Sequence, residues 1–179
     1  MSKSRFSTRR LATAGIIAGI YAALTLFLPI PQYGGVQLRV AEAMTVLPFL
    51  FPEAVPGLAV GCFLANLLGS PYVLDWVFGT LATFLGALWC RRFRSRPALA
   101  LFGFVLANAL IVPLYLPILL QGLGYYTIPF TSISLEGMYI PMYLFGVVAV
   151  GIGEALVMYI LGLPLLRAIR KFGVAGDEG

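Results

Sequence analysis

Long apolar runs follow one another along the chain, separated only by short breaks that contain Pro, Gly or charged residues. The first run, from Leu11 to Leu28, would extend about 27 Å as an α-helix, close to the roughly 30 Å hydrocarbon core of a bilayer. With 60% hydrophobic and 11% charged residues, the chain carries more apolar surface than a soluble core of 179 residues can bury. We therefore predict an integral membrane protein.

The pattern of apolar runs predicts an all-α fold, a bundle of six transmembrane helices. The first run ends in Pro29-Ile30-Pro31 without a small-x-small cleavage site, so we interpret it as a retained span. Prolines bound the second and third segments, which favours tilted, kinked or partly re-entrant helices there. We expect a basic N-terminus at residues 1–10, the membrane domain at 11–168 and a tail at 169–179. The segments after the first are Val40 to Phe51, Val55 to Leu68, Asp75 to Cys90, Ala98 to about Leu120, and Gly137 to Leu166.

The basic residues support an even number of crossings with both termini in the cytoplasm. If the chain starts inside, only Arg39 of the twelve basic residues falls on the outer side. The net charge of +5 is then explained by the topology of the chain in the membrane, and no nucleic-acid partner is needed to explain it. The eleven inner basic residues are Lys3, Arg5, Arg9, Arg10, Arg91, Arg92, Arg94, Arg96, Arg167, Arg170 and Lys171.

Three acids lie near the outer ends of predicted helices: Glu42, Asp75 and Glu136. Each stands at or just before a helix start, where a carboxylate accepts free main-chain N–H groups, so each is either a helix cap or a ligand-binding group. Because all three acids face the outer side of the membrane, they favour a vestibule that attracts cations or recognises an amidine. Arg39 stands three residues before Glu42 and is expected to orient it.

Polar residues also occur inside predicted helices. Glu154 lies about 18 Å from the inner end of its helix, where capping does not explain it, and Asn108 lies at a similar depth. The two side chains form either an interhelical hydrogen bond or part of a binding site. Asn66 is either a C-cap before Gly69 or a ligand.

Two aromatic side chains are candidates to stack on a flat ring, Trp76 and Tyr139. The alternative is the aromatic belt found at membrane interfaces. A separate stripe of small residues, Ala14, Ala18 and Ala22, allows another helix to approach closely. That helix belongs either to the same bundle or to another subunit.

The sequence lacks the residues of the commoner enzyme classes. It has no histidine, no GxxxxGK[ST] phosphate loop, and no HExxH or GxSxG motif. We therefore expect no enzymatic activity, no metal and no cofactor. Cys62 and Cys90 lie 28 residues apart in apolar segments, and we expect both to be small packing residues.

Several blocks, taken in order and spacing, resemble the QueT family, the substrate-binding S components of energy-coupling-factor (ECF) transporters for queuosine precursors. The blocks cover most of the chain. They are Val36-Gln37-Leu38-Arg39-Val40-Ala41-Glu42-Ala43 with Leu47-Pro48, Pro56-Gly57-Leu58 with Gly61, Ala65-Asn66-Leu67, Asp75-Trp76-Val77-Phe78-Gly79-Thr80-Leu81-Ala82-Thr83, Asn108, and Gly153-Glu154-Ala155.

The resemblance implies a six-helix S component in the bacterial plasma membrane that binds 7-aminomethyl-7-deazaguanine or a related deazapurine from outside. It also implies association with a transmembrane coupling subunit and two ATPase subunits, with Ala14, Ala18 and Ala22 as the docking stripe. The alternatives are an S component for another vitamin-like nutrient and a stand-alone ion-coupled carrier. The expected substrate-binding residues are Arg39, Glu42, Asn66, Asp75, Trp76, Asn108, Glu136, Tyr139 and Glu154.

Overall fold

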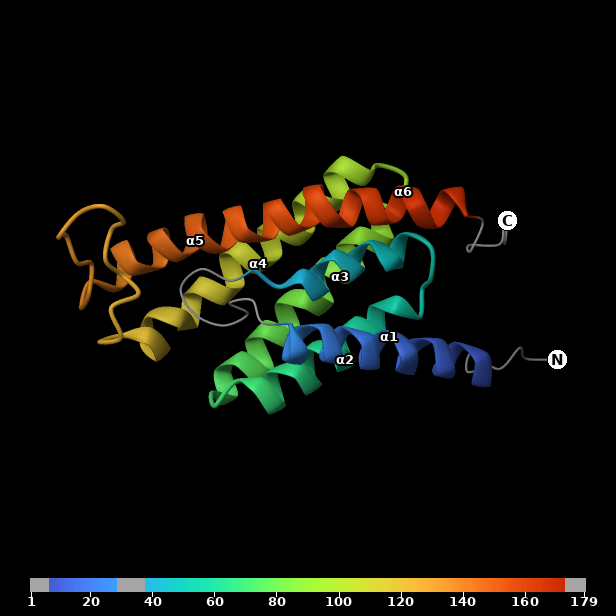
Figure 1. Cartoon of the computed structure of the whole chain (residues 1–179), viewed down its shortest axis with the longest axis horizontal. Helices are drawn as coiled ribbons and strands as arrows, with labels where there is room; N and C mark the ends of the chain where they lie inside the picture. The colour runs from blue at the N-terminus through green and yellow to red at the C-terminus, as the bar shows by residue number, and fades with distance from the viewer. Residues whose placement is uncertain (1–6, 29–37, 173–179) are drawn as a thin grey trace.

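The computed structural model describes residues 7–28 and 38–172, and these ranges are mainly helical. Lys3, Arg5, Val36, Gln37 and residues 173–179 lie outside them. In chain order the elements are α1 (Thr8–Phe27), η1 (Val40–Phe49), α2 (Ala54–Gly69), η2 (Asp75–Gly79), α3 (Thr80–Arg92), α4 (Pro97–Leu120), α5 (Tyr139–Leu156), η3 (Val157–Gly162) and α6 (Leu163–Lys171) (Figure 1).

Several of these elements join without a break. The backbone stays helical at Thr80 between η2 and α3, and at Val157 and Leu163 around η3. The two joined helices therefore run over 75–92 and 139–171, each containing one wider π-helical stretch. Each predicted segment corresponds to one helical segment of the described residues, and most boundaries agree within about three residues.

Among the described helices, three are long and apolar enough to cross a membrane: Thr8–Phe27, Pro97–Leu120 and the joined helix Tyr139–Lys171. Val40–Phe49 and Ala54–Gly69 are shorter apolar helices. Apolar side chains also face outward along these helices, for example Ile118, which is 64% exposed, and Leu144, which is 56% exposed. Because a soluble protein does not expose so many large apolar side chains, the fold is that of a membrane protein.

The second segment, η1, is a 3₁₀ helix, which the sequence analysis did not anticipate. Its main-chain bonds span three residues at both ends, from Glu42 N to Arg39 O at 2.9 Å and from Leu50 N to Leu47 O at 2.9 Å. Near its end, Arg91 donates a hydrogen bond to the Pro48 carbonyl at 3.1 Å. At about 2.0 Å per residue, a 3₁₀ helix of ten residues extends about 20 Å, farther than the same residues would as an α-helix.

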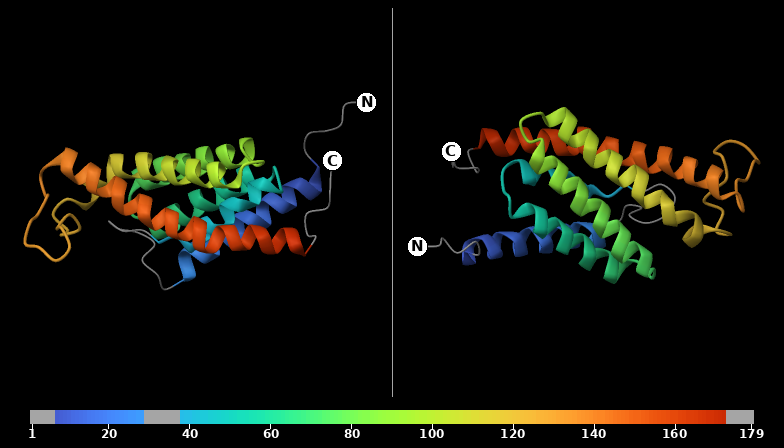
Figure 2. Two further views of the ribbon diagram at one scale, coloured as in Figure 1. Left: turned by 90° about the horizontal axis from the view of Figure 1, so that it is seen from above. Right: turned by 180° about the vertical axis from the view of Figure 1, so that it is seen from behind.

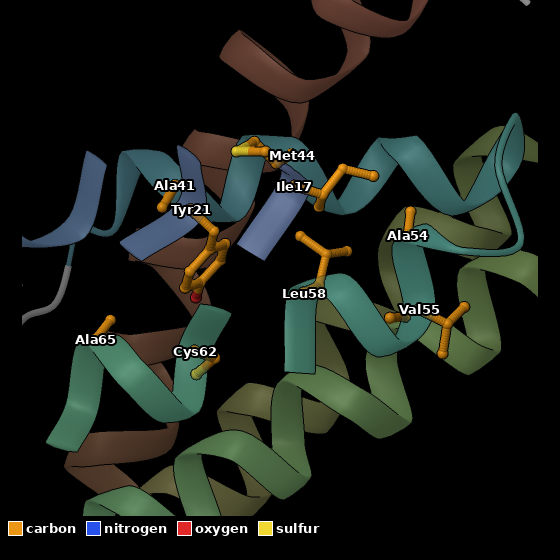
Figure 3. Close-up of a cluster of buried hydrophobic side chains, with 10 residues drawn as sticks. Ile17, Tyr21, Ala41, Met44, Ala54, Val55, Leu58, Cys62 and Ala65 are labelled. Carbon is orange, nitrogen blue, oxygen red and sulfur yellow. The ribbon is translucent and has the colours of Figure 1, made fainter. Parts of the chain in front are cut away.

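Helices α1 and α2 approach closely because α2 presents two glycines to α1. A Cβ added to Gly57 would lie 2.8 Å from the Ala14 carbonyl oxygen, and one added to Gly61 would lie 2.8 Å from the Ala18 carbonyl oxygen. Ala14 and Ala18 of the predicted small-residue stripe therefore pack within the bundle, beside an apolar cluster shown in Figure 3. Gly15 has open space around it instead.

The ends of the bundle differ in charge. Figures 1 and 2 show the start of α1, the α3–α4 connection and the end of α6 at the same end of the bundle. The connection between α4 and α5 lies at the opposite end. The first end carries the basic clusters Arg9-Arg10, Arg91 to Arg96, and Arg167 to Lys171. This distribution agrees with the charge asymmetry that places basic residues on the cytoplasmic side.

Candidate functional site

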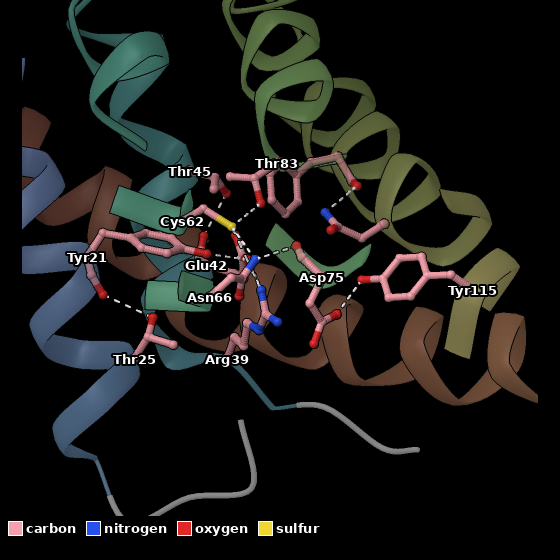
Figure 4. Close-up of polar contacts among 12 residues, drawn as sticks. Tyr21, Thr25, Arg39, Glu42, Thr45, Cys62, Asn66, Asp75, Thr83 and Tyr115 are labelled. Atoms are coloured by element: carbon pink, nitrogen blue, oxygen red, sulfur yellow. Dashed lines mark hydrogen bonds and ion pairs between the residues drawn. The ribbon is translucent and has the colours of Figure 1, made fainter. Parts of the chain in front are cut away.

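A cluster of buried polar side chains lies inside the bundle, between helices that are otherwise apolar (Figure 4). The side chains come from helices that are far apart in the chain, so the complete fold is needed to bring them together. At its centre the cluster contains Tyr21 of α1, Arg39 and Glu42 at the start of η1, Cys62 and Asn66 of α2, Asp75 of η2, Thr83 of α3 and Tyr115 of α4.

Glu42 is held by its neighbours through one of its two carboxylate oxygens. The Tyr21 hydroxyl donates a hydrogen bond to Glu42 Oε1 at 2.5 Å, and Arg39 Nη1 lies 4.0 Å from the same oxygen. Glu42 Oε2 is buried and has no hydrogen-bond partner among residues 7–28 and 38–172. The hydrogen bond of this side chain thus joins η1 to α1 across the bundle.

Cys62 is more than a packing residue. Its Sγ accepts hydrogen bonds from Thr83 Oγ1 at 3.3 Å and Asn66 Nδ2 at 3.5 Å, and Arg39 Nη1 lies 3.8 Å away. The expectation of a packing role holds better for Cys90, whose thiol bonds the Ala100 carbonyl at 3.3 Å within an apolar cluster. Cys62 therefore links three polar groups of the site.

Asp75 is paired on both carboxylate oxygens. Ser70 donates to Oδ2 at 2.6 Å, and the Tyr115 hydroxyl donates to Oδ1 at 2.7 Å. The Asp75 carbonyl accepts a bond from Asn66 Nδ2 at 2.9 Å, so this amide joins α2 to η2 instead of capping α2 with its side chain.

Glu154 lies on the side of the cluster formed by α5. It is 5% exposed and interacts electrostatically with Glu42 and Arg39. Asn108 is buried on the neighbouring α4, but its Nδ2 donates to the Phe104 carbonyl of its own helix at 3.3 Å. Among the described residues, no hydrogen bond joins Asn108 to Glu154.

Within the part of the chain that the structure describes, three buried acceptor atoms of the cluster have no hydrogen-bond partner: Glu42 Oε2, Asn66 Oδ1 and Glu154 Oε2. Leaving a polar group buried without a partner costs about 1–3 kcal/mol, and more when the group is charged. A ligand that offers N–H donors or a positive charge would satisfy these atoms. Such an arrangement is suited to binding a small, donor-rich molecule.

The remaining predicted site residues lie at the edge of the cluster or away from it. Trp76 is half-buried beside Asp75, and its indole N–H bonds the Ser70 carbonyl at 2.9 Å. Tyr139 is 43% exposed and donates to the Leu114 carbonyl at 2.6 Å. These two aromatic side chains are therefore in different environments.

Glu136 belongs to the connection between α4 and α5. Its Oε2 accepts a bond from Gly122 N at 2.9 Å, which ties the two ends of the connection together. Gly122 has φ +80°, a conformation that favours glycine. Burial raises the pKa of the Tyr126 phenol in the same connection, and the Glu136 carboxylate adds to the rise. Glu136 thus acts in a separate polar contact of this loop.

Four contributors to the cluster were missed in the sequence analysis: Tyr21, Ser70, Thr83 and Tyr115. Tyr21 and Tyr115 carry a signal that points to them, because each places a hydroxyl within a long apolar run. Ser70 and Thr83 are too common in membrane helices and their ends to stand out. Within residues 7–28 and 38–172, no group of three His, Cys, Asp or Glu side chains is placed to hold a metal ion.

Apolar helices around a buried polar cluster are typical of membrane proteins that bind or move polar solutes, the class to which transporters belong. A family model described as QueT transporter matches residues 11–171, so the chain belongs to the QueT transporter family.

One curated relative is named Queuosine precursor transporter QueT, from Lactococcus lactis subsp. cremoris (strain MG1363). It is 32% identical over 101 residues, which cover 53% of this chain and 58% of the relative. The match therefore spans little more than half of the relative's length. No solved structure matches the chain.

Proposed function

We propose that this protein is the substrate-binding S component of an ECF importer and captures 7-aminomethyl-7-deazaguanine or a related deazapurine from outside the cell. Membership of the QueT transporter family and the name of the Lactococcus relative support this substrate class. The observation that carries the proposal is the set of unpaired acceptors Glu42 Oε2, Asn66 Oδ1 and Glu154 Oε2 inside the bundle.

The chemistry of the ligand complements these acceptors. A guanine-like edge presents adjacent N–H donors that one carboxylate can accept together, and an aminomethyl group presents a cation that a second carboxylate can neutralise. In this proposal Glu42, Glu154 and Asn66 contact the ligand. Asp75 and Arg39 shape and balance the site, because Asp75 already uses both oxygens internally.

Trp76 and Asn108 stay candidates for a ring-stacking surface and an amide contact beside this site. Glu136 and Tyr139 have a different proposed role, at the outer entrance of the bundle. Tyr139 lines a cavity of about 120 Å³ together with Gln121 and Met142, and Glu136 closes the neighbouring connection. A ligand entering from this end would pass these two residues first.

In the proposed topology the chain crosses the plasma membrane six times with both termini in the cytoplasm. The three basic clusters at one end of the bundle support this orientation. A transmembrane coupling subunit and two ATPase subunits would supply the energy. A groove of about 510 Å³ between α1 and α2, lined by residues such as Ala14, Gly15, Ala18 and Gly57, supports docking of the coupling subunit there.

Calorimetry on the purified protein in detergent tests this function. The ligands are 7-aminomethyl-7-deazaguanine, its nitrile analogue, guanine and a panel of vitamins. Tight and selective binding of a deazapurine supports the proposal. Binding only to a vitamin would support an S component for another substrate. A folded protein that binds no member of the panel would favour the ion-coupled carrier.

A further inference from the structure

Glu42 and Glu154 belong to neighbouring segments of the bundle: Glu42 lies in η1, and Glu154 lies in α5, which continues into η3. The Thr45 hydroxyl is 3.0 Å from Met158 Sδ, which fixes η1 against η3 at this point. Figure 1 shows η1 and the α5–α6 helix running in the same direction. A Cβ added to Gly162, one turn after Met158, would lie 3.1 Å from Val46 Cγ1 and 3.6 Å from the Ala43 carbonyl oxygen, so η1 and η3 pack directly against each other.

In both segments the acid lies a short distance before the residues that make these contacts. Glu42 precedes Thr45 by three residues, about 6 Å along a 3₁₀ helix. Glu154 precedes Met158 by four residues, also about 6 Å along an α-helix. Both carboxyl groups are buried, and each has an unpaired Oε2. The two side chains also interact electrostatically with each other.

The charges around this pair do not balance. Among the described residues, Arg39 is the basic side chain buried with the carboxylates, and it lies near Glu42 and Glu154. The other ionisable groups that face the cluster are Tyr21 on α1, Cys62 on α2, Asp75 on η2 and Tyr115 on α4, and none of them supplies a positive charge. Two carboxylates thus share one guanidinium in an apolar interior, where an uncompensated charge is strongly disfavoured.

We propose that Glu42 and Glu154 hold one proton between them in the unliganded protein and release it to water when a cationic ligand binds. This inference rests on the proposed function, from which it takes the amine-bearing ligand. The ammonium group of the ligand takes the place of the proton, so the net charge of the site is the same before and after binding. No covalent bond to the ligand forms or breaks.

Linkage fixes the direction of the pH effect. Because binding releases a proton, a rise in pH favours the complex, and affinity for the amine increases by up to about tenfold per pH unit while the pair is protonated. A ligand with a neutral substituent leaves the proton in place, and its affinity does not change over the same range. The site therefore discriminates between the amine and its nitrile analogue more strongly at high pH.

Calorimetry of the full chain at one pH, in buffers with different ionisation enthalpies, counts the released protons. We expect about one proton per bound 7-aminomethyl-7-deazaguanine and none for the nitrile analogue. Tight binding of the amine with the same heat in every buffer would overturn this inference and leave the proposed function intact. Absence of binding by any deazapurine would overturn the proposed function and this inference together.

Two substitutions locate the proton. Glutamine cannot take up the proton, so Glu154→Gln is expected to bind the amine without proton release and with an affinity that no longer depends on pH. Glu53→Gln is the matched control, because Glu53 pairs with Arg10 at 3.0 Å in a separate ion pair and its variant should release the same proton as the unchanged protein. Full proton release from the Glu154 variant would contradict the assignment of the proton to this pair. If the variant does not fold, the buffer series on the unchanged protein still tests the inference.

Discussion

The Tyr115 hydroxyl donates a hydrogen bond to Asp75 Oδ1 over 2.7 Å and so joins the last part of α4 to η2, the π-helical segment that leads into α3. The second oxygen of Asp75 is held by Ser70 at 2.6 Å. With donors on both sides, this carboxylate is fixed in one orientation before any ligand arrives. The amide of Asn66, which donates to the Asp75 carbonyl, is therefore held in place before a ligand binds.

Replacing Tyr115 with Phe tests that role. The substitution removes the donor and leaves Asp75 Oδ1 buried without it, so we expect a loss of about 1–3 kcal/mol in unfolding free energy. The change should appear as a lower Tm of the purified protein in detergent. Tyr159→Phe is the control, because the Tyr159 hydroxyl bonds the Ala98 carbonyl from an exposed position. Equal Tm values for the two variants would argue against a stabilising Tyr115–Asp75 bond.

Substituting Glu154 with Gln should weaken binding of the aminomethyl ligand without unfolding the protein. A hydrogen bond to a charged group contributes about 1.5–3 kcal/mol, so we expect Kd to increase by about 10- to 100-fold. Titration calorimetry measures the change, with the nitrile analogue as a ligand that should lose less affinity. An unchanged Kd for the amine would remove Glu154 from the site.

The contact between α1 and α2 predicts a cost for any side chain at Gly61. A Cβ there would lie 2.8 Å from the Ala18 carbonyl oxygen and 2.9 Å from Tyr21 Cβ, so Gly61→Ala must push the two helices apart. We expect a loss of about 1–3 kcal/mol in unfolding free energy, measured by denaturation in detergent.

Gly19→Ala is the matched control for this substitution, because nothing lies within 4 Å of a Cβ at Gly19. Alanine is also the better helix former, so this variant should be as stable as the unchanged protein or more stable. A Gly61 variant that behaved like the Gly19 variant would show that α1 and α2 are packed less closely than described.

The groove between α1 and α2 gives a prediction for assembly. Gly15 lines this groove with open space around it, so Gly15→Leu should fill the groove and prevent co-purification of the coupling subunit while ligand binding by the isolated protein persists. Ala18→Leu should instead destabilise the isolated protein, because Ala18 is 5% exposed and packs against α2. Gly19→Leu places the same side chain outside the groove lining and serves as control. A Gly15 variant that still assembled would place the coupling subunit elsewhere.

Much of the helical framework could be predicted from the sequence, because Pro, Gly and charged residues interrupt the apolar runs where the helices end. Asp75 and Leu120, for example, bound helices as expected. The 3₁₀ winding of η1 and the π-helical stretch at Val157–Gly162 were not predictable, because small changes in main-chain hydrogen bonding depend on packing against other helices. Six membrane crossings and the orientation of the termini stay predictions.

The residues of the candidate site could be predicted only in part from the sequence. Charged and amide side chains in apolar segments stand out in a sequence, and Glu42, Asn66 and Glu154 do lie in the buried cluster. Which predicted residues meet depends on the rotation of each helix about its own axis. That rotation turns Asn108 to its own main chain and leaves Glu136 in a loop contact.

The 3₁₀ winding of η1 makes the length of this segment as important as its composition. With three residues per turn, side chains three positions apart lie on one face, so Arg39, Glu42 and Thr45 all reach the interior. Inserting or deleting one residue between them would turn the following side chains by about 120° and carry Glu42 or Thr45 away from its partners. A change in the number of residues between Arg39 and Thr45 would therefore dismantle the site in one step.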